Sequence, residues 1–369
     1  MLSRPRIVVI TNVLAPYRVE FYRRLCADPA FDVSFLFGGH PRLETNWALK
    51  PNMQIRGEML SRVSFRGKPV WNPSLSRRLR ALAPDLVVCV GASSQLAIAL
   101  RYARPRHVPV LVWWGGTIES EAHVTGFKSH WRRWLFQRVD GFFLYSSFTG
   151  DYVRSVIGET KPMFILGNNT MDADAWRQRV SQARAAQQPK SEPVILGLGQ
   201  LIPRKNYALA VKLVARLRDP VRLLLAGTGE LAAALQEQAR ELGVESRVEL
   251  VGDVAHDQLP CLLAQTRVFL HPATMDQWPQ VINEAMSAGL PVILSRRSGV
   301  PADFARDGEN CFVRDPADED GWLNALEKLL HDDALTQRLG RAAAETAASR
   351  DIGYALEEFK RGVRKVLAQ

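Results

Sequence analysis

Short apolar runs recur along the chain and alternate with segments whose apolar residues repeat every three or four positions. Each run ends in polar residues or glycine, which is typical of strands buried in a parallel sheet. In the first half, the predicted strands span residues 6–13, 32–37, 86–90, 108–114, 141–145 and 163–166. The predicted helices span residues 17–27, 75–82, 95–103, 127–138 and 147–157. This alternation predicts an α/β fold with a doubly wound sheet.

The same alternation begins again in the second half. The predicted strands there span residues 194–198, 221–226, 247–251, 268–270 and 292–294, and the predicted helices span residues 206–216, 231–242, 257–264, 279–288, 319–347 and 353–367. Between the two halves lies a polar stretch without apolar periodicity, which predicts a linker. We therefore expect two Rossmann-like domains with an interdomain cleft. The expected parts are residues 1–178, a linker at 179–193, residues 194–345, and a helix in 346–369 that crosses back to the first domain.

Length and composition agree with this organisation. At 369 residues the chain exceeds one ordinary core, and with 47% hydrophobic and 23% charged residues it has a globular composition. The four cysteines are widely spaced and form no zinc or redox pattern, which indicates a reducing compartment. No segment reads as a signal peptide or a membrane span. We expect a cytoplasmic protein.

The net charge of +10 is uneven. Residues 1–185 hold 26 Lys and Arg against 13 Asp and Glu, whereas residues 186–369 hold 22 against 25. A basic first half is typical of proteins with an anionic partner such as a membrane surface or a phospholipid-linked substrate. An arginine-rich solvated surface explains the excess equally well. Peripheral attachment at the inner face of the membrane therefore stays open.

The stretch 271–295 carries the strongest candidate chemistry. A strand runs into a polar loop with Asp276 and Trp278, and a short helix follows with Pro279 in its first turn and Glu284 further along. In nucleotide-binding folds the ligand lies at the carboxyl ends of the strands. Both acids are expected to face that crevice, although solvated acids near a helix N-terminus are the plainer alternative.

Three glycine-rich turns also follow predicted strands. In residues 197–206 the loop ends with Arg204 and Lys205 at a helix start, where backbone amides and a lysine can hold phosphate. Residues 226–230 and 298–300 either contact a ligand or simply turn the chain. The aromatic and basic helix 127–138 could touch nucleic acid, but aromatics at helical spacing are more often core. We expect no nucleic-acid partner.

These motifs resemble the family 4 retaining glycosyltransferases. The resemblance rests on residues 195–206, the AGTGEL turn at 226–231, VELVGD at 248–253, and above all the acid-x7-Glu block with Ala-Met and Gly-Leu-Pro at 276–291. The segment TNVLAPYRVEFYRRL is similar to the opening of transferases of bacterial surface polysaccharide clusters. The resemblance implies the GT-B fold, which consists of two Rossmann-like domains.

The resemblance also implies roles for individual residues. Asp276 would contact the donor's hexose hydroxyls, Glu284 the ribose hydroxyls, and Lys205 the departing diphosphate, and these three are the predicted catalytic residues. The predicted donor-binding residues are Gly199, Gln200, Arg204, Lys205, Gly227, Asp253, Asp276, Trp278, Gln280, Val281 and Glu284. The predicted acceptor contacts are Tyr17, Arg18, Glu119 and His123, although solvated loop residues explain Glu119 and His123 equally well.

Three positions depart from the family pattern. Gln200 replaces the usual arginine, Asp276 is one methylene shorter than the usual glutamate, and Pro279 replaces a glycine and lacks an N–H donor. We expect a retaining glycosyltransferase that moves a sugar from a nucleotide sugar to a lipid-linked or polysaccharide acceptor, with no metal or other cofactor. The alternatives are a nucleotide-sugar epimerase of the same fold and a catalytically weak nucleotide-sugar-binding protein.

Overall fold

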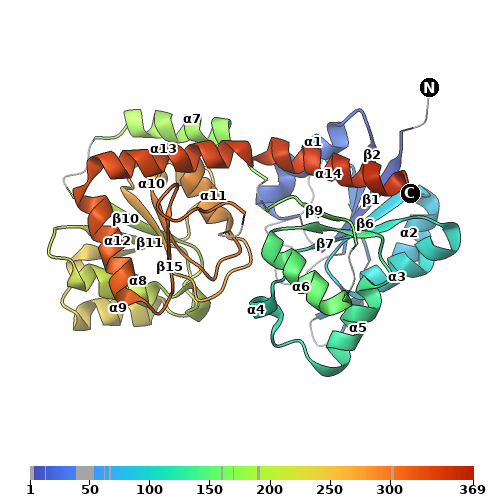
Figure 1. Cartoon of the computed structure of the whole chain (residues 1–369), viewed down its shortest axis with the longest axis horizontal. Coiled ribbons are helices and arrows are strands. Elements are labelled where there is room, and N and C mark those ends of the chain that lie inside the picture. The colour runs from blue at the N-terminus through green and yellow to red at the C-terminus, as the bar shows by residue number, and fades with distance from the viewer. Residues whose placement is uncertain are drawn as a thin grey trace. The chain divides into compact units, whose positions relative to one another are not determined.

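The apolar runs of the first half lie side by side in one parallel sheet (Figure 1). The computed structural model describes residues 4–12, 14–38, 54–61, 63–65, 68–158, 161–168, 170–188, 192–300 and 303–369. Within these residues the strand order is β3-β2-β1-β6-β7-β8-β9. The bounds are β1 Arg6–Thr11, β2 Asp32–Phe37, β3 Gly57–Met59, β6 Leu86–Val90, β7 Val110–Trp114, β8 Gly141–Leu144 and β9 Met163–Ile165. A short antiparallel pair, β4 Val63–Phe65 and β5 Lys68–Trp71, stands apart from the sheet.

This first sheet is buried on both faces because its strands are almost wholly apolar. Alternate residues of β1 enter different cores: Val8 and Ile10 join one cluster, and Ile7 and Val9 join the other. The helices that follow the strands cover these faces. They are α1 Val19–Ala27, α2 Leu75–Leu82, α3 Ser94–Ala103, α4 Ile118–Glu121, α5 Gly126–Phe136, α6 Ser147–Ile157 and α14 Ile352–Leu367.

The last helix, α14, belongs to the first unit although it ends the chain. Phe359 of α14 stacks on Phe143 of β8 with ring centroids 4.9 Å apart. Gly362 lies so close to the same ring that a β-carbon there would fall 2.4 Å from it. The first unit therefore comprises Met1–Met171 and Ile352–Gln369, and the second unit comprises Asp172–Asp351.

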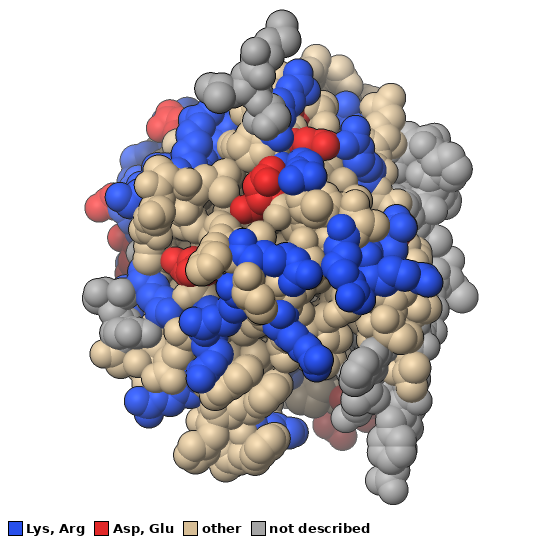
Figure 2. All heavy atoms as spheres, turned by 90° about the vertical axis from the view of Figure 1, so that its right-hand side faces the viewer, with Lys and Arg blue, Asp and Glu red and all other residues tan. Residues whose placement is uncertain are grey.

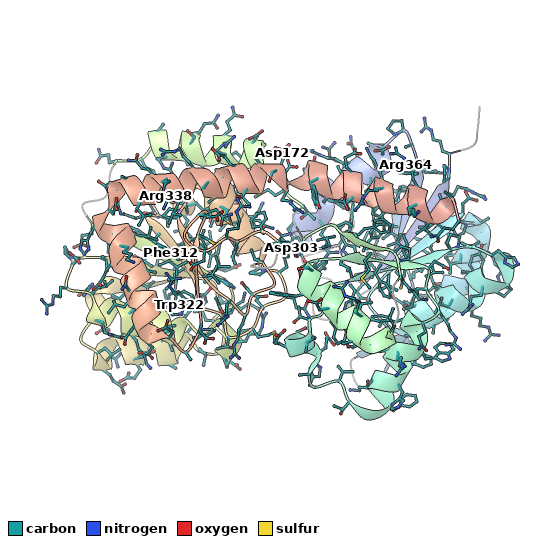
Figure 3. The ribbon with its side chains drawn as sticks, viewed as in Figure 1. Asp172, Asp303, Phe312, Trp322, Arg338 and Arg364 are labelled. Atoms are coloured by element: carbon teal, nitrogen blue, oxygen red, sulfur yellow. The ribbon has the colours of Figure 1, made fainter. Side chains whose placement is uncertain are left out.

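The second unit repeats the architecture with a parallel sheet in the order β12-β11-β10-β13-β14-β15. Its strands are β10 Val194–Leu198, β11 Arg222–Ala226, β12 Val248–Gly252, β13 Val268–His271, β14 Val292–Ser295 and β15 Phe312–Arg314. Its helices are α7 Ala173–Ala185, α8 Tyr207–Arg216, α9 Ala232–Glu241, α10 Leu259–Ala264, α11 Gln280–Ser287, α12 Glu319–His331 and α13 Asp333–Ser349. Trp322 of α12 is fully buried in the core of this unit (Figure 3).

The prediction of a linker at 179–193 was wrong. Much of that stretch belongs to α7, which starts at Ala173, is capped by Asp172 (labelled in Figure 3), and packs on α10 and α11. The helix buries only the narrow stripe Ala173, Trp176 and Val180, so the apolar periodicity is weak in its second half. Residues 189–191 of the expected linker lie outside the described residues.

Two further expectations about helices need correction. The predicted helix 319–347 is two helices, because Asp332 ends α12 and its side chain caps the first turn of α13. The aromatic residues of α5 are core only in part: Phe136 is fully buried, whereas Phe127, Trp131 and Trp134 are exposed. Among the described residues, no helix combines the length and the apolar character needed to cross a bilayer.

Candidate functional site

Four loops at the carboxyl ends of β10, β11, β13 and β14 are joined by backbone hydrogen bonds. The amide of Gly199 donates to Ala226 O and that of Leu201 to Thr228 O, both at 2.9 Å. The amide of Thr274 donates to Arg204 O, and that of Gly299 to Asp276 O, again at 2.9 Å. These bonds fix the loops relative to one another, so side chains on them are held in place before any ligand arrives.

The glycines in these loops permit the close approach. A β-carbon on Gly227 (φ +139°) would fall 2.0 Å from the carbonyl oxygen of Gly199, and one on Gly299 would fall 1.7 Å from that of Gln277. Neither clash can be relieved by a side-chain rotation, because the obstacle is backbone. The plainer reading of both glycine turns, a tight connection, is therefore correct for Gly227 and Gly299, whether or not they also contact a ligand.

A buried ion pair lies where the loops meet. Lys205 ends the 3-10 turn Pro203–Lys205 before α8, and Asp276 follows β13. Lys205 Nζ lies 2.5 Å from Asp276 Oδ2, and Arg204 Nη1 lies 3.5 Å from Oδ1 of the same carboxylate. Asn206, in the left-handed region at φ +55°, turns the chain into α8. The structure thus brings together three predicted donor residues, of which Lys205 and Asp276 are 71 residues apart in sequence.

His271, the last residue of β13, is the fourth member of this cluster. It is fully buried, and its Nε2 lies 3.4 Å from Asp276 Oδ2. Burial lowers the pKa of His271, so its imidazole is neutral. Burial alone would raise the pKa of Asp276, but His271 and Lys205 outweigh it and hold that pKa well below its usual range. Asp276 is therefore an anion at neutral pH.

Tyr207 and Gly199 form the floor beside the ion pair. Tyr207 is buried, and no described group forms a hydrogen bond with its hydroxyl. A β-carbon on Gly199 (φ +143°) would lie 3.3 Å from that hydroxyl and 3.7 Å from Lys205 Nζ. Glycine at this position therefore places no side chain against Tyr207 and Lys205.

Glu284 lies in a second part of the candidate site, on α11. It is 7% exposed, and burial raises the pKa of its carboxyl to about 7. Trp176 Nε1 donates to the Glu284 carbonyl at 3.0 Å, and His256 Nδ1 lies 3.8 Å from Glu284 Oε1. The His256 ring stacks on Trp176 with centroids 5.1 Å apart. Glu284 therefore has a protonation state that a ligand can shift near neutral pH.

The remaining predicted donor residues are placed differently. Trp278 is buried against Phe304, with ring centroids 6.0 Å apart, so its indole is part of the core. Gln280 Oε1 accepts from Asn283 Nδ2 at 2.8 Å at the start of α11, where Val281 is half-buried. Gln200 and Asp253 are exposed in the loops after β10 and β12. Pro279 is the N-cap of α11, one residue before the helix rather than in its first turn.

Sequence reasoning missed three residues of this region. His271 was treated as the end of a strand, and His256 and Trp176 were not considered. His256 had a detectable signal, because it follows β12 in a strand-end loop like the other candidates. Trp176 had none, since no helix was predicted around it and only the second half of α7 lay in the predicted linker.

The predicted acceptor residues lie in the first unit. Arg18 is buried, and Tyr17 beside it is partly exposed. Glu119 lies on α4 and His123 follows it, and both are exposed. In the described part of the chain, neither of them forms a hydrogen bond or ion pair with Arg18. Among the described residues, no three His, Cys, Asp or Glu side chains cluster closely enough to hold a metal ion.

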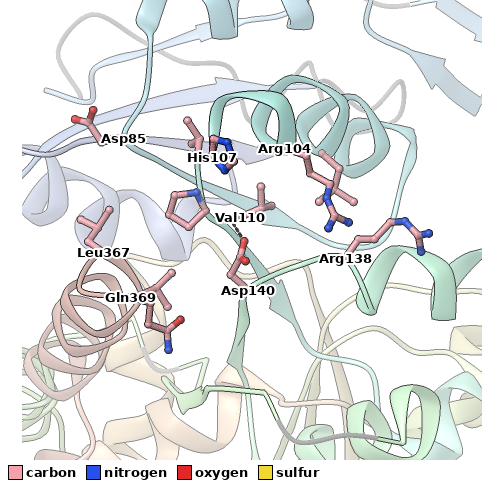
Figure 4. Close-up of a pocket in the computed structure, with 12 residues that line it drawn as sticks. Asp85, Arg104, His107, Val110, Arg138, Asp140, Leu367 and Gln369 are labelled. Atoms are coloured by element: carbon pink, nitrogen blue, oxygen red, sulfur yellow. Dashed lines mark hydrogen bonds between the residues drawn. The ribbon is translucent and has the colours of Figure 1, made fainter.

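A hollow of about 520 Å³ lies elsewhere, at the amino ends of the first-unit strands (Figure 4). Asp140 points into this region but accepts the amide of Val110 at 2.7 Å. Asp85, another lining residue, pairs with Arg6. Because its acids already have structural partners and it lies at the edge opposite the carboxyl ends, we assign this hollow no role in binding.

Known proteins resemble this chain most clearly in the sequence of the second unit. Residues 179–346 match the family model described as glycosyl transferases group 1. The lipopolysaccharide core biosynthesis glycosyltransferase LpsE of Rhizobium meliloti is 35% identical over 158 residues, which cover 43% of this chain and 45% of LpsE. The D-inositol 3-phosphate glycosyltransferase of Corynebacterium diphtheriae is 30% identical over 181 residues, which cover 47% and 42%. The matched segment thus spans less than half of these two relatives.

Solved structures match the whole chain. Anabaena HepE in complex with UDP superposes with a TM-score of 0.82 at 17% identity, covering 98% of this chain and all of HepE. Sucrose-phosphate synthase from Thermosynechococcus elongatus superposes with a TM-score of 0.78 at 16% identity, covering 99% and 100%. The predicted α/β fold with two Rossmann-like units of GT-B type is confirmed, and the second unit carries the sequence pattern of the group 1 glycosyl transferases.

Proposed function

We propose that the protein is a retaining glycosyltransferase that moves a sugar from a nucleotide sugar to a lipid-linked or polysaccharide acceptor. The observation that carries this proposal is the buried Lys205–Asp276 pair at the carboxyl ends of the second sheet, within the segment that matches the glycosyl transferase model. The similarity to LpsE supports an acceptor that belongs to a bacterial surface glycan. The HepE complexes with UDP and UDP-glucose make UDP-sugars the first donors to test.

In this proposal the ion pair is shared with the donor. Hexose hydroxyls donate to the Asp276 carboxylate, while Lys205 and the half-exposed Arg204 donate to the diphosphate. Negative charge develops on the diphosphate as the glycosidic bond breaks, so two cations fixed at that position stabilise the transition state more than the ground state. With this positive charge supplied by the chain, we infer that no metal is required. The leaving phosphate then assists deprotonation of an acceptor that attacks the same face of the sugar.

Glu284 is proposed to hold the ribose of the nucleotide. Ribose hydroxyls are donors, and they favour the ionised carboxylate over the protonated form. Because the pKa of Glu284 is raised to about 7, the affinity of the site for the nucleotide should be lowest below neutral pH, where the carboxyl is protonated. His256 lies beside the carboxyl group from the neighbouring loop, and Trp176 of α7 holds the backbone of Glu284 through its carbonyl oxygen.

The experiment has two stages. Thermal shifts with UDP, GDP and dTDP, and then with their sugars, identify the donor, because a ligand that binds only the folded state raises the melting temperature. The identified donor is then incubated with membrane lipid extract, and the products are analysed. Transfer of sugar to an extractable lipid supports the proposal, whereas an altered nucleotide sugar identifies an epimerase.

Site variants separate a transferase from a protein that only binds. Lys205→Ala is expected to lower turnover at least a hundredfold, since removing one charge-stabilising donor typically costs that much. Lys212→Ala is the matched control, because Lys212 pairs with Glu319 on the exposed face of the same unit. Nucleotide-sugar binding with no transfer by the wild type, or unchanged turnover in Lys205→Ala, would refute the assignment.

We further propose that the first unit attaches peripherally to an anionic membrane at its cytoplasmic face. Figure 2 shows Lys and Arg gathered over one face of this unit. Exposed arginines of the unit include five on α2, on α3 and in the turn after α3: Arg77, Arg80, Arg101, Arg104 and Arg106. On α5 the rings of Phe127, Trp131 and Trp134 are exposed and stacked, with centroids 6.5 and 5.0 Å apart. Exposed aromatics on a basic helix suit the interfacial layer of a bilayer.

A further inference from the structure

Arg18 is a buried arginine whose hydrogen-bond partners are all neutral. It ends the 3-10 turn Pro16–Arg18 after β1 and is 5% exposed. Its Nη2 donates to the Tyr145 hydroxyl and, at 3.1 Å, to Asn168 Oδ1, and its Nη1 lies 3.5 Å from the Tyr22 hydroxyl. The guanidinium carbon lies 4.9 Å from the ring centroid of Trp113. Aromatic and amide groups therefore surround this cation.

No carboxylate among the described residues pairs with Arg18, and its Nε has no hydrogen-bond partner there. Two other poorly exposed cations in the described part of the chain each have an acid: Lys205 has Asp276, and Arg132 has Glu121 at 2.5 Å. Burying a charge without a counter-ion is costly, and neutral dipoles repay only part of that cost. An arginine with an unused donor in such a place is therefore prepared for an anion that the chain does not supply.

The position of Arg18 suits a ligand site. Tyr145 follows β8, Asn168 follows β9, and Trp113 is near the end of β7, so the cluster lies at the carboxyl edge of the first sheet, where ligands of such folds bind. The Tyr17 ring, 39% exposed, lies 5.7 Å from the guanidinium carbon and forms its solvent-facing neighbour. The Thr170 hydroxyl donates to Tyr17 O at 2.5 Å and holds this turn against the segment after β9.

The guanidinium is also held in a fixed orientation. Gly115 lies against the face of Tyr145, where a β-carbon would fall 2.3 Å from the ring, so Tyr145 cannot move toward it. Tyr145 and Asn168 both accept hydrogen bonds from Nη2, and Nε is buried without a hydrogen-bond partner among the described residues. A planar guanidinium fixed in this way matches the paired oxygens of a phosphate or carboxylate, and little ordering entropy is lost on binding.

We propose that Arg18 binds an anionic group, a phosphate or a carboxylate, and that this group belongs to the acceptor. Tyr145 and Asn168 act as positioning residues. The anion site follows from the first unit alone, whereas its assignment to the acceptor rests on the proposed transferase function. An anionic acceptor also accounts for the position of the site on the unit with the large excess of Lys and Arg.

The test measures anion binding by the full-length chain with inorganic phosphate and with glucuronate as probes. Both are titrated calorimetrically into a parent chain with Lys205→Met/Asp276→Leu, which lacks both charges of the buried pair in the second unit, and into the same parent carrying Arg18→Met, Arg18→Lys or Tyr145→Phe. Arg154→Met, which removes an exposed arginine on α6 that pairs with Asp151, is the matched control. Arg18→Met is expected to weaken binding of the preferred probe about tenfold to a hundredfold, as loss of charge-assisted hydrogen bonds does, and Arg154→Met to leave it unchanged.

Folding of the variants is followed by their melting temperatures. An arginine without a counter-ion costs stability, so Arg18→Met is expected to melt at or above the wild-type temperature in phosphate-free buffer. Arg18→Lys keeps the positive charge but loses the planar guanidinium, and Tyr145→Phe removes the hydroxyl that accepts a hydrogen bond from the guanidinium. Both variants are therefore expected to bind the anion several-fold more weakly. Anion binding that is equal in the parent chain and in the parent carrying Arg18→Met would overturn the proposal, as would a parent chain that binds neither probe together with a lowered melting temperature in Arg18→Met.

The two probes and a transfer assay separate the remaining possibilities. Preference for phosphate indicates a phosphorylated group, and preference for glucuronate an acidic sugar. With the acceptor identified by the transfer assay, Arg18→Met is expected to raise its KM at least tenfold and leave the KM of the donor unchanged. An unchanged acceptor KM would overturn the acceptor assignment, and anion binding without any sugar transfer would refute the proposed function while leaving the anion site standing.

Discussion

The ammonium nitrogen of Lys205 lies 2.5 Å from Asp276 Oδ2, and the two side chains are only 9% and 12% exposed. Their loops follow β10 and β13, which are neighbours in the second sheet. The attraction between the two charges must offset the loss of water around both. The local structure therefore depends on each partner being present.

Replacing Lys205 with methionine is expected to lower the free energy of unfolding by about 3–5 kcal/mol, because it leaves the Asp276 carboxylate buried without its main cation. Arg204, at 3.5 Å and 40% exposed, compensates only in part. The double variant Lys205→Met/Asp276→Leu should recover most of the loss, since neither charge remains. Urea denaturation of the two single variants and the double variant measures this coupling.

The surface pair Lys212–Glu319 provides the comparison. Its side chains are 50% and 40% exposed, so Lys212→Met is expected to change stability by less than about 1 kcal/mol. If the double variant at 205 and 276 lost as much stability as the two single variants added together, the side chains would be energetically independent and this account of the pair would be wrong.

Stability at mildly acidic pH is expected to depend on Glu284. Burial raises the pKa of Glu284 to about 7, whereas the pKa of a glutamate in the unfolded chain is about 4.3. The folded protein therefore holds this proton more tightly, and the contribution to stability is complete below the unfolded pKa and is lost as pH rises through 7. We expect Glu284→Gln to remove up to about 3 kcal/mol of this pH dependence between pH 5 and 8. Denaturation at several pH values checks it.

Nucleotide binding should act on the same proton. If ribose hydroxyls donate to the carboxylate, binding favours the ionised form and releases a proton near pH 7. Affinity for the identified nucleoside diphosphate should then rise between pH 6 and 8, by at most about tenfold per pH unit. Calorimetry in two buffers with different ionisation enthalpies counts the released proton. Equal proton release by wild type and Glu284→Gln would show that another group is responsible.

Sequence reasoning predicted most strands and helices because the buried strands are mostly apolar runs and most strand-end loops carry glycine or proline. It missed the short strands β3, β4, β5 and β15. It placed Lys205 on a loop neighbouring that of Asp276 but did not predict their ion pair, because sequence spacing gives no distance between side chains. It predicted that the aromatics of α5 are core, which holds for Phe136 but not for Phe127, Trp131 and Trp134, since periodicity does not show whether a face is covered. It missed α7, whose buried stripe around Trp176 is too narrow to stand out from polar neighbours.

Replacing Gly227 with alanine is expected to unfold the second unit or to lower its stability by at least about 3 kcal/mol. The new β-carbon would lie 2.0 Å from the Gly199 carbonyl oxygen, in a backbone conformation that alanine disfavours. Gly243→Ala is the control, since Gly243 also has a positive φ (+70°) but open space around its Cα. It should cost only about 1–2 kcal/mol. Equal losses in the two variants would show that backbone conformation, and not the contact with Gly199, governs this position.

The exposed aromatics of α5 are expected to determine membrane attachment. Phe127→Ser/Trp131→Ser/Trp134→Ser removes three rings that contribute little to the core, so the melting temperature should change little, while binding to anionic vesicles should fall about tenfold or more because each ring loses its apolar burial in the bilayer. Phe148→Ser, at an exposed aromatic on α6, should leave binding unchanged. Co-sedimentation at low and high salt separates the two contributions, since arginine attraction weakens with salt and ring burial does not. Equal binding by the wild type and the triple variant at both salt concentrations would exclude α5 as the attachment element. Attraction between the arginines and the anionic lipids would then be the remaining explanation for binding.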